Sequence, residues 1–299
     1  ATRRLGETAH VTRIPRDTFT SSSSSSRTHA HARTHARTHA GGVVPAENTM
    51  VSSSSSVVAS AARRVRVVVW GGSGYVGSAI ARALVRHGDD APSSSSVKSE
   101  VDVVCASRGG RAPAWATRDD WSARVTWVAG DALDAQACER VNAGADVVVT
   151  AIGVLPFPWM SSEDIIKYNA ETNVTPGRAA MATGASRLVV VGASIPPFVP
   201  GLASYAKGKA IVEAFARDEF ASTVSTNGDE TQHGQRRRRS AVVLKPAAVS
   251  GTRRAGALSI PLWAALDPAR KVLRLVGNSA IMTNAPVPLE NVARAAARA

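Results

Sequence analysis

The stretch VRVVVWGGSGYVG, residues Val65–Gly77, decides the fold. Val65–Trp70 is a short run rich in β-branched residues, which suits a strand buried on both faces of a parallel sheet. Glycines follow at once, and beyond them Val76, Ile80 and Leu84 form an apolar stripe at helical spacing. The stretch therefore predicts a strand, a tight glycine turn and a helix.

Each glycine of this turn has a mechanical task at a phosphate-binding site. Gly71 permits the tight turn, Gly74 lets the backbone approach a pyrophosphate, and Gly77 lets the helix pack closely on the strand. A glycine-rich turn without a ligand is the alternative, but this one follows a predicted strand and opens the first βα unit. The residues expected to hold a dinucleotide here are Gly71, Ser73, Gly74, Tyr75, Val76 and Gly77.

Strands alternate with helices along the next part of the chain. Segments with the composition of strands are Val101–Cys105, Val125–Val128, Asp146–Thr150, Arg187–Val191 and Ala241–Leu244. Helical spacing lies between them, and in one such segment, Glu163–Thr183, Pro176 is a candidate interruption. The alternation predicts an α/β fold, a doubly wound parallel sheet or Rossmann fold. After Pro246 the pattern becomes irregular, and we expect a small C-terminal substrate-side lobe that ends in an Ala/Arg helix.

The composition changes sharply near Ala61. Residues 1–60 contain the serine runs Ser21–Ser26 and Ser52–Ser56 and several arginines, but few acidic residues. Such a segment cannot bury enough apolar surface to fold. Its composition is typical of a mitochondrial or plastid transit peptide, with a plain disordered tail as the alternative. We therefore expect residues 1–60 to be a disordered targeting segment for the mitochondrion, or alternatively the chloroplast, and residues 61–299 to form the nucleotide-binding domain.

The formal net charge of +13 does not indicate nucleic-acid binding. Much of it lies in residues 1–60 and in Arg236–Arg239, within a polar stretch, Ser222–Ser240, that we expect to be a solvated insertion. No aromatic residues interleave with these charges, as a base-stacking surface requires. Cys105 and Cys138 are too few for a zinc site and imply no disulfide framework. We expect no metal at these positions, only buried thiols.

The end of the second strand distinguishes between the two nicotinamide dinucleotides. An acidic residue there would hydrogen-bond the adenosine ribose of NAD, whereas an arginine would meet the 2′-phosphate of NADP. This corner carries Ser107 and Arg108 and no acid, so NADP(H) is favoured, with NAD(H) as the alternative. The residues expected to flank the adenine and the ribose from the next two strand ends are Asp131, Ala151, Ile152 and Gly153.

A second set of residues follows the fifth strand, with Ser194 first and then Tyr205 and Lys209 on the next predicted helix. Residues four apart share a helical face, so the ammonium can lie beside the phenol, favour its ionised form and lower its pKa toward neutrality. Most basic residues here are arginines, whereas a compact ammonium can reach both a ribose and a phenol. We expect Ser194, Tyr205 and Lys209 to be catalytic and Lys209 also to bind the cofactor, with an ordinary helix residue as the alternative for Tyr205.

Together these motifs resemble the short-chain dehydrogenase/reductase superfamily in its extended and atypical branches. The likeness covers GGSGYVG at 71–77, SRGGRAP at 107–113, and Ser194 with Tyr205 and Lys209. It is greatest for the group that includes the Rossmann-fold accessory subunit of respiratory complex I, a fungal mitochondrial coenzyme-Q biosynthesis protein and plant plastid proteins. Asn169 resembles that group's helix asparagine beside the active site. Pro246 matches its Arg-Pro-Gly turn, which reads Lys-Pro-Ala here.

Two function classes follow from the residues and the resemblance. One is an NAD(P)-dependent oxidoreductase with a Ser-Tyr-Lys site, in which Tyr205 exchanges the proton with an unknown small molecule such as a quinone or another carbonyl compound. The other is a non-catalytic nucleotide-binding accessory or assembly factor of a mitochondrial respiratory or ubiquinone-biosynthesis complex, associated with an organelle membrane. The intact Ser-Tyr-Lys set favours the first. The resemblance favours the second, because that group has members that bind the nucleotide without evident turnover.

Overall fold

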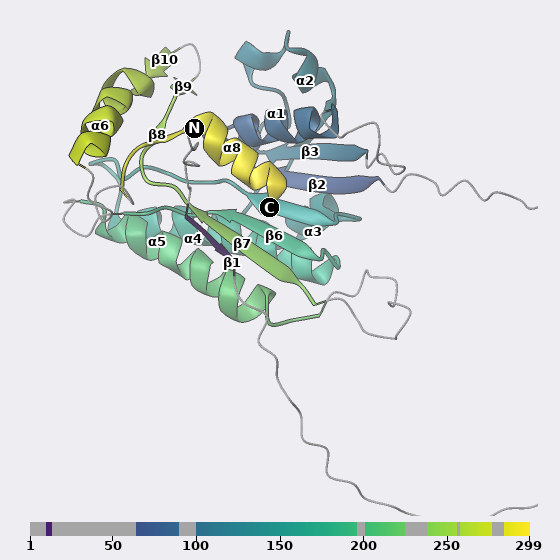
Figure 1. Ribbon diagram of the computed structural model, residues 1–299. Coiled ribbons are helices and arrows are strands. Elements are labelled where there is room, and N and C mark those ends of the chain that lie inside the picture. The colour runs from purple at the N-terminus through teal and green to yellow at the C-terminus, as the bar shows by residue number, and fades with distance from the viewer. Residues whose placement is uncertain are drawn as a thin grey trace, which may run out of the picture. The chain divides into compact units, whose positions relative to one another are not determined.

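The computed structural model describes residues 10–13, 64–89, 100–195, 201–224, 238–255, 258–276 and 284–299. Within them, seven strands form a sheet in the order β1-β7-β6-β5-β2-β3-β4. Six are parallel, namely β2 (Val65–Trp70), β3 (Val101–Ser107), β4 (Val125–Ala129), β5 (Val147–Thr150), β6 (Arg187–Val191) and β7 (Ser240–Lys245). Their order reverses direction between β2 and β5, which is the doubly wound Rossmann arrangement (Figure 1). The predicted fold class is confirmed.

Helices cover both faces of this sheet (Figure 1). On one face lie α1 (Tyr75–Asp89), α2 (Asp120–Ala123) and α8 (Leu289–Arg298), together with a short 3-10 turn, η1 (Ala114–Ala116). On the other lie α3 (Ala135–Asn142), α4 (Ser162–Ala182) and α5 (Ala203–Ala214), which continues as a π-helical turn, η2 (Phe215–Phe220). Pro176 does not interrupt α4. The packing of this buried helix outweighs the one helical hydrogen bond that proline cannot make.

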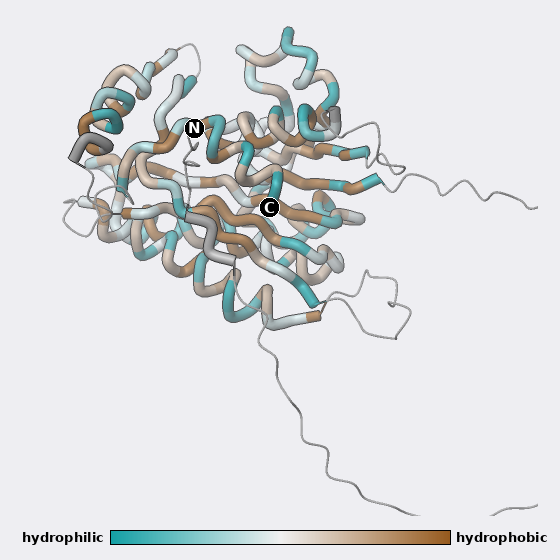
Figure 2. The backbone as a smooth tube through the Cα atoms, in the orientation of Figure 1, coloured by the Kyte–Doolittle hydropathy of each residue, from teal (hydrophilic) through white to brown (hydrophobic). Residues whose placement is uncertain are grey.

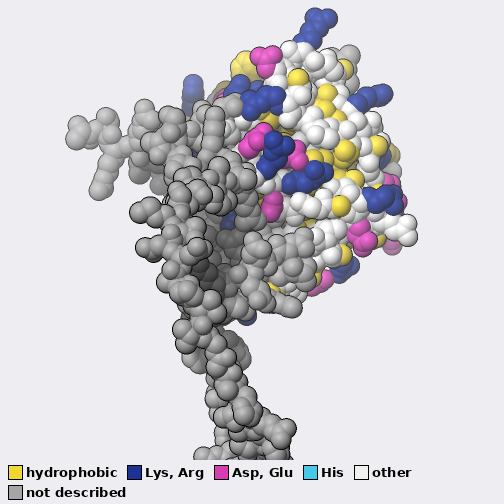
Figure 3. All heavy atoms as spheres, turned by 90° about the vertical axis from the view of Figure 1, so that its right-hand side faces the viewer, with side chains coloured by type: hydrophobic (Ala, Val, Ile, Leu, Met, Phe, Trp, Pro, Cys, Tyr) yellow, Lys and Arg dark blue, Asp and Glu magenta, His cyan; other side chains and the backbone are white. Residues whose placement is uncertain are grey.

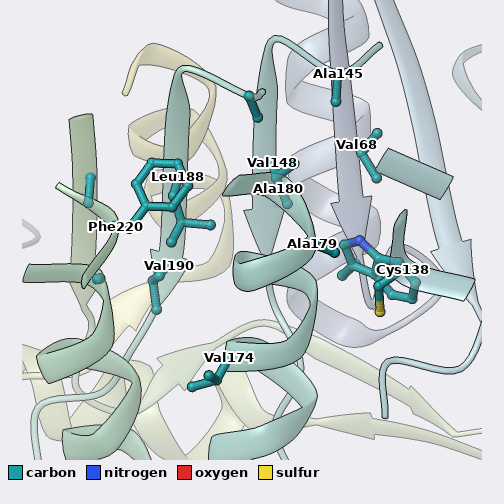
Figure 4. Packing of buried hydrophobic residues seen from close by; sticks show 14 of the residues in the cluster. Val68, Cys138, Ala145, Val148, Val174, Ala179, Ala180, Leu188, Val190 and Phe220 are labelled. Atoms are coloured by element: carbon teal, nitrogen blue, oxygen red, sulfur yellow. The ribbon is translucent and has the colours of Figure 1, made fainter. Parts of the chain in front are cut away.

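The hydrophobic core has two parts, one on each face of the sheet, and the strands appear as its apolar centre in Figure 2. Side chains of a strand point alternately to opposite faces. Val68 of β2 therefore joins the cluster that contains Leu188 and Phe220, seen in Figure 4, while its neighbours Val67 and Val69 join the cluster beneath α1. Because both faces are covered, the strand carries valine at consecutive positions instead of alternating with polar residues.

A buried asparagine fixes α3 against the sheet and against α4. The indole N–H of Trp70, at the end of β2, donates to Asn142 Oδ1 at 2.9 Å. Asn142 Nδ2 in turn donates to the carbonyl oxygen of Pro176, also at 2.9 Å. Both side chains are fully buried, so each polar group needs the partner it has. This chain of contacts holds the carboxyl end of β2 in place just before the glycine turn.

The chain after β7 is more regular than its sequence indicates. β8 (Val249–Ser250) pairs with β11 (Val287–Pro288), β9 (Thr252–Ala255) forms a hairpin with β10 (Leu258–Pro261), and α6 (Leu262–Val276) follows. These strands are two to four residues long and α6 contains Pro268, so neither gives a clear periodic signal. The hairpin and α6 form the C-terminal lobe, which Figure 1 shows beyond one end of the sheet.

Two segments that the sequence places outside the fold take part in it. β1 (His10–Arg13) pairs antiparallel with β7; the rest of residues 1–60 lies outside the described residues, as do Arg236 and Arg237 of the arginine run. Arg239 is buried instead of solvated, because its guanidinium donates to the carbonyl oxygens of Met181 (2.7 Å) and Ala185 (3.2 Å). Burial lowers the pKa of Arg239. A run of charges in sequence does not reveal such main-chain acceptors.

Charged side chains at the amino ends of β2 and β3 form ion pairs. Arg64 contacts Glu100 at 2.7 Å, and Arg66 contacts Asp102 at 3.1 Å. Figure 3 shows one face of the molecule, on which basic and acidic side chains are interspersed and no patch of a single sign stands out. The visible part of this face therefore has no one-signed field of the kind that attracts a polyanion.

Candidate functional site

The glycine turn lies between the carboxyl ends of β2 and β5, where the strand order reverses. Gly71 has a φ of +80°, a conformation that favours glycine. A Cβ at Gly77 would lie 2.1 Å from the carbonyl oxygen of Gly71, so only glycine lets α1 approach β2 this closely. Gly74 is exposed and α1 begins at the next residue, so the first N–H groups of the helix are available to an anion.

The side chains of the turn lie in different surroundings. Val76 packs against the cluster beneath α1, so its contribution is to the core. Tyr75 lies at the base of the C-terminal lobe, where its hydroxyl donates to the carbonyl oxygen of Val249 at 3.3 Å. Burial raises the pKa of Tyr75 to about 12, the Arg253 charge opposes this, and the Asp267 charge adds to it. Ser73 is half-buried beside them.

The corner after β3, where the adenosine was expected, is a tight turn open to solvent. Gly110 N donates to the carbonyl oxygen of Ser107 at 3.1 Å, and Gly110 has a φ of +58°, so a tight turn follows the strand. Arg108, at the tip of that turn, is exposed. Asp131, past β4, is also exposed, and its carboxylate accepts a hydrogen bond from Leu133 N at 3.0 Å. The corner thus offers one accessible guanidinium and one carboxylate already engaged with the backbone.

Two buried asparagines of α4 hold the segment after β5, where Ala151, Ile152 and Gly153 were expected to face the cofactor. Asn173 pairs with both backbone groups of Ile152, at 3.3 Å to its N and 3.1 Å to its carbonyl oxygen. Asn169 does the same for Val154, at 3.1 and 2.9 Å. Each side-chain amide acts like the peptide group of a further strand, so the segment stays extended and rigid beyond the sheet.

Lys209 lies at the centre of this site. Its ammonium donates to the carbonyl oxygens of Ile152 (2.9 Å) and Val191 (3.2 Å). Ile152 lies just after the end of β5, and Val191 is the last residue of β6. A Cβ added to Gly153 would lie 3.4 Å from Lys209 Nζ, so this glycine lies directly beside the ammonium. Burial lowers the pKa of Lys209 to about 8. The compact ammonium is thus fixed near the carboxyl ends of β5 and β6.

Tyr205 shares a face of α5 with Lys209, as their spacing predicts, and the ammonium lies 5.9 Å from the centre of its ring. The expected lowering of its pKa is wrong for this arrangement. Burial raises the pKa of Tyr205 and the charge of Arg253 only partly opposes this. The physical reason is that Lys209 directs its N–H groups at two carbonyls, while the phenol loses solvent. At neutral pH Tyr205 therefore keeps its proton.

Ser194 follows β6, as expected, but its contacts lead elsewhere. Its N–H donates to the carbonyl oxygen of Pro246 at 2.8 Å, and its hydroxyl donates to Asn284 Oδ1 at 3.4 Å. The structure thus brings Tyr205 and Lys209 together and connects Ser194 to the segment that precedes β11. The Ser-Tyr-Lys set shares one end of the sheet without forming one hydrogen-bonded triad.

Sequence reasoning missed Asn173 and Arg253. Asn169 and Asn173 are four apart on a predicted helix, so the second asparagine could have been found from the first. Arg253, on β9, influences both Tyr75 and Tyr205 and is half-buried. It had no usable signal, because it lies in the irregular part of the sequence.

In the part of the chain that the structure describes, His, Cys, Asp and Glu side chains form no group of three or more that could hold a metal ion. Cys105 and Cys138 are buried free thiols, as expected, and burial is the main reason that the pKa of each is raised to about 12. No described helix is long and apolar enough to cross a membrane.

Comparison with known proteins gives one family match and one curated relative. Residues 67–201 match the model of the NAD dependent epimerase/dehydratase family, which confirms the superfamily resemblance seen in the sequence. An uncharacterised chloroplastic protein of Arabidopsis thaliana is 32% identical over 210 residues, which are 69% of this chain. The chain spans 58% of the length of that relative.

Solved structures agree on the fold. A short-chain dehydrogenase/reductase from Serratia marcescens aligns with a TM-score of 0.51 and 16% identity, over 79% of this chain and 90% of its own. A UDP-N-acetylglucosamine 4-epimerase from Methanobrevibacter ruminantium, in complex with UDP-N-acetylmuramic acid, aligns with a TM-score of 0.52 and 17% identity, over 79% of this chain and 74% of its own. Both likenesses concern the arrangement of the sheet and its helices.

Proposed function

We propose that the protein is an NADP(H)-dependent oxidoreductase acting on a carbonyl compound, from the premise that residues 67–201 match the model of the NAD dependent epimerase/dehydratase family. The observation that carries the proposal is the placement of Lys209 and Tyr205 on one face of α5. The Lys209 ammonium is fixed by hydrogen bonds of 2.9 and 3.2 Å at the ends of β5 and β6. This is the side of the glycine turn where a nicotinamide riboside would extend.

The residues present fit a dinucleotide. Gly71 and Gly77 leave no room for a Cβ, whereas the exposed Gly74 leaves the start of α1 open to a pyrophosphate. Gly153 lies beside the Lys209 ammonium, and Asn169 and Asn173 hold the backbone of this segment in place. Rigid backbone beside a bound cofactor reduces the entropy lost on binding.

Preference for NADP(H) rests on Arg108, which is exposed at the end of β3 with no acid beside it on the turn. We expect NADPH to bind more tightly than NADH, and Arg108→Ala to remove most of the difference. Titration of the two cofactors by nicotinamide fluorescence would measure it, with Arg118→Ala, another exposed arginine, as the control. Equal affinity of the unaltered protein for NADH would contradict the preference.

In the proposed reaction a dinucleotide held by the glycine turn and Lys209 would supply the hydride for the carbonyl carbon. Tyr205 donates its proton to the carbonyl oxygen, which yields an alcohol, and water returns a proton to Tyr205. The raised pKa of Tyr205 favours the role of acid, because the phenol stays protonated at neutral pH. Lys209 binds the ribose and keeps a positive charge near the phenolate that forms.

The test is Tyr205→Phe, assayed with NADPH against a panel of quinones and small carbonyl compounds. Turnover should fall by about a hundredfold or more while NADPH affinity stays nearly unchanged, since only the proton donor is lost. Tyr168→Phe is the matched control, because Tyr168 is an exposed tyrosine of α4. Lys209→Met should damage both binding and turnover. Full activity of Tyr205→Phe on a substrate that the unaltered protein reduces would rule out the mechanism.

Quinones are part of this substrate panel because of two aromatic residues that follow Gly153. Phe157 and Trp159 stack with ring centres 4.8 Å apart, and both are exposed, Trp159 by 79%. An exposed apolar aromatic pair on the segment that follows Gly153 suits a hydrophobic ring better than a sugar. Loss of quinone reduction, without loss of small-ketone reduction, in Trp159→Ser would support this choice.

A non-catalytic nucleotide-binding subunit is the second candidate. It is favoured by the two carbonyls that already engage Lys209 and by the burial of Tyr205. In that case the nucleotide would stabilise the fold in an accessory or assembly factor of a respiratory or quinone-biosynthesis complex. Neither Tyr205→Phe nor Lys209→Met would then change anything beyond stability and nucleotide affinity.

We also propose that residues 1–60 direct import into an organelle. Their composition alone favours the mitochondrion, but the Arabidopsis relative is described as chloroplastic, and this supports the plastid. A fluorescent protein fused behind residues 1–60 should enter the plastids of a leaf cell. A cytosolic signal would remove the import proposal, and a mitochondrial signal would overturn only the compartment.

A further inference from the structure

A cavity of about 360 Å³ lies between the start of α1 and the C-terminal lobe. Trp115 of η1, Trp263 and Asp267 of α6, and Arg254 of β9 contribute to its walls. On another side it reaches Arg82 and Glu290, which pair with each other at 3.4 Å. Its size is that of small-molecule sites in proteins.

Two of the charged walls have unused hydrogen-bonding capacity. The guanidinium of Arg254 lies 4.7 Å from the ring centre of Trp115, and Arg254 is exposed. A guanidinium over an indole face keeps its N–H donors in its own plane, where they can form a bidentate pair with a carboxylate. Oδ1 of Asp267 is buried, yet it has no hydrogen-bond partner among the residues that the structure describes. A buried acceptor without a donor costs stability, so such an atom suggests a missing partner.

The aromatic walls favour a flat ligand. The side chain of Trp263 is 51% exposed, although its backbone N–H is fixed to the carbonyl oxygen of Gly251 at 3.2 Å. An exposed indole on a fixed backbone offers its ring face to a planar molecule. Trp115 provides a second indole in the same cavity.

The cavity is apart from the nicotinamide end of the cofactor cleft. Tyr205, Lys209 and Ser194 do not line it, and neither do Ser107, Arg108 and Asp131 at the adenosine corner. Ser73, Gly74 and Tyr75 do, so the cavity borders the glycine turn. A ligand there could bind together with the dinucleotide and act on its affinity through the shared turn.

We infer that this cavity is a second binding site, for a small planar aromatic carboxylate that also carries an N–H donor. The carboxylate pairs with Arg254, the ring lies against Trp263 or Trp115, and the N–H group is directed to Asp267. The inference is independent of the proposed proton transfer, since Ser194, Tyr205 and Lys209 do not line the cavity.

The test uses 4-aminobenzoate as the probe, with binding measured by titration calorimetry on the full chain. Arg254→Met should weaken binding by about tenfold or more, because a charge-assisted pair is lost. Arg178→Met is the matched control, since Arg178 also lies over an aromatic ring, 5.7 Å from the centre of Phe215, but outside the cavity. Benzoate, without the N–H donor, and aniline, without the carboxylate, should each bind more weakly than 4-aminobenzoate.

Asp267→Asn separates a binding role from a structural one. If Asp267 serves the ligand, this variant should bind 4-aminobenzoate several times more weakly, yet melt at the same temperature or higher, since a buried unpartnered carboxylate oxygen is replaced. Loss of both binding and stability would make Asp267 structural and contradict its role here. Equal binding by Arg254→Met and the control would overturn the site.

A final titration distinguishes the cavity from the cofactor cleft. NADPH should still bind when 4-aminobenzoate saturates the protein, with a change in affinity that reaches a limit. An apparent NADPH dissociation constant that rises without limit as 4-aminobenzoate is added would mean that both occupy the same place. That result would overturn the second site and leave the proposed oxidoreductase function untouched.

Discussion

Residues of the same kind differ in burial and in hydrogen bonding between the parallel sheet and the C-terminal lobe. Val149 of β5 is 1% exposed, whereas Val272 of α6 is 59% exposed. Asn142, beneath the sheet, pairs with both neighbours through its amide, whereas Asp267 in the lobe has a buried oxygen without a partner in the described part of the chain. The sheet is built for stability, and the lobe retains surface and polar groups that a ligand could use. This division predicts that equivalent substitutions have unequal effects in the two regions.

The largest effect should come from Gly77→Ala in α1. The added Cβ would lie 2.1 Å from the carbonyl oxygen of Gly71, so helix and turn must separate. We expect a loss of about 4 kcal/mol or more in the free energy of unfolding, or no folded protein at all. Denaturant unfolding followed by circular dichroism would measure it.

Gly88→Ala is the control in the same helix. The nearest atom to its added Cβ is 4.0 Å away, so this variant should be unchanged or about 0.5–1 kcal/mol more stable. If Gly77→Ala were equally harmless, the close contact of α1 with β2 would not be needed, and the glycine turn would lose its structural explanation.

Asn142→Ala should have the next largest effect. It leaves the N–H of Trp70 and the carbonyl of Pro176 buried without partners, which costs about 3 kcal/mol. Gln136→Ala, at an exposed position of the same helix, should change stability by less than about 0.5 kcal/mol. If Asn142→Ala and Gln136→Ala lowered stability equally, water would be satisfying the groups that Asn142 leaves behind, and the contrast with Asp267 would disappear.

Lys209 gives a prediction about pH. Its pKa in the folded protein is about 8, below the ordinary 10.5. At pH values between these two, the unfolded chain still holds a proton that the folded protein has released. Stability from this group therefore rises as pH increases from about 8 to about 10.5, by on the order of 3 kcal/mol at most.

Other groups titrate in the same range, so the Lys209 effect must be taken as a difference. The raised pKa values of Cys105, Cys138 and Tyr75 act in the opposite direction, since those groups lose their protons later in the folded protein. Lys209→Met shares these groups but lacks the amine. Between pH 7.5 and pH 10 the free energy of unfolding should therefore rise less, or fall more, in Lys209→Met than in the unaltered protein. Parallel curves for the two proteins would contradict a buried ammonium.

The same contrast explains what the sequence could predict. The valine run of β2, the glycine turn and the spacing of Tyr205 and Lys209 are local patterns, and each was found at its expected place. The partners of Lys209 are main-chain carbonyls of two other strands, and those of Ser194 lie at Pro246 and beyond. No residue type marks such partners in sequence. The direction of the Tyr205 pKa depends on them, and so it was missed.

The smallest effect should be that of Val272→Ala in the lobe, and the same substitution at Val149 gives the scale. Val149→Ala removes two methyl groups from a packed site and should cost about 2 kcal/mol. Val272 is 59% exposed on α6, so Val272→Ala loses little burial. Alanine is also the better helix former, and the change should stay within about 0.5 kcal/mol of zero. Unfolding of both variants in denaturant would compare them. A cost at Val272 as large as that at Val149 would mean that the exposed face of α6 is covered in solution, and the lobe would then be an interface instead of an open wall of the ligand cavity.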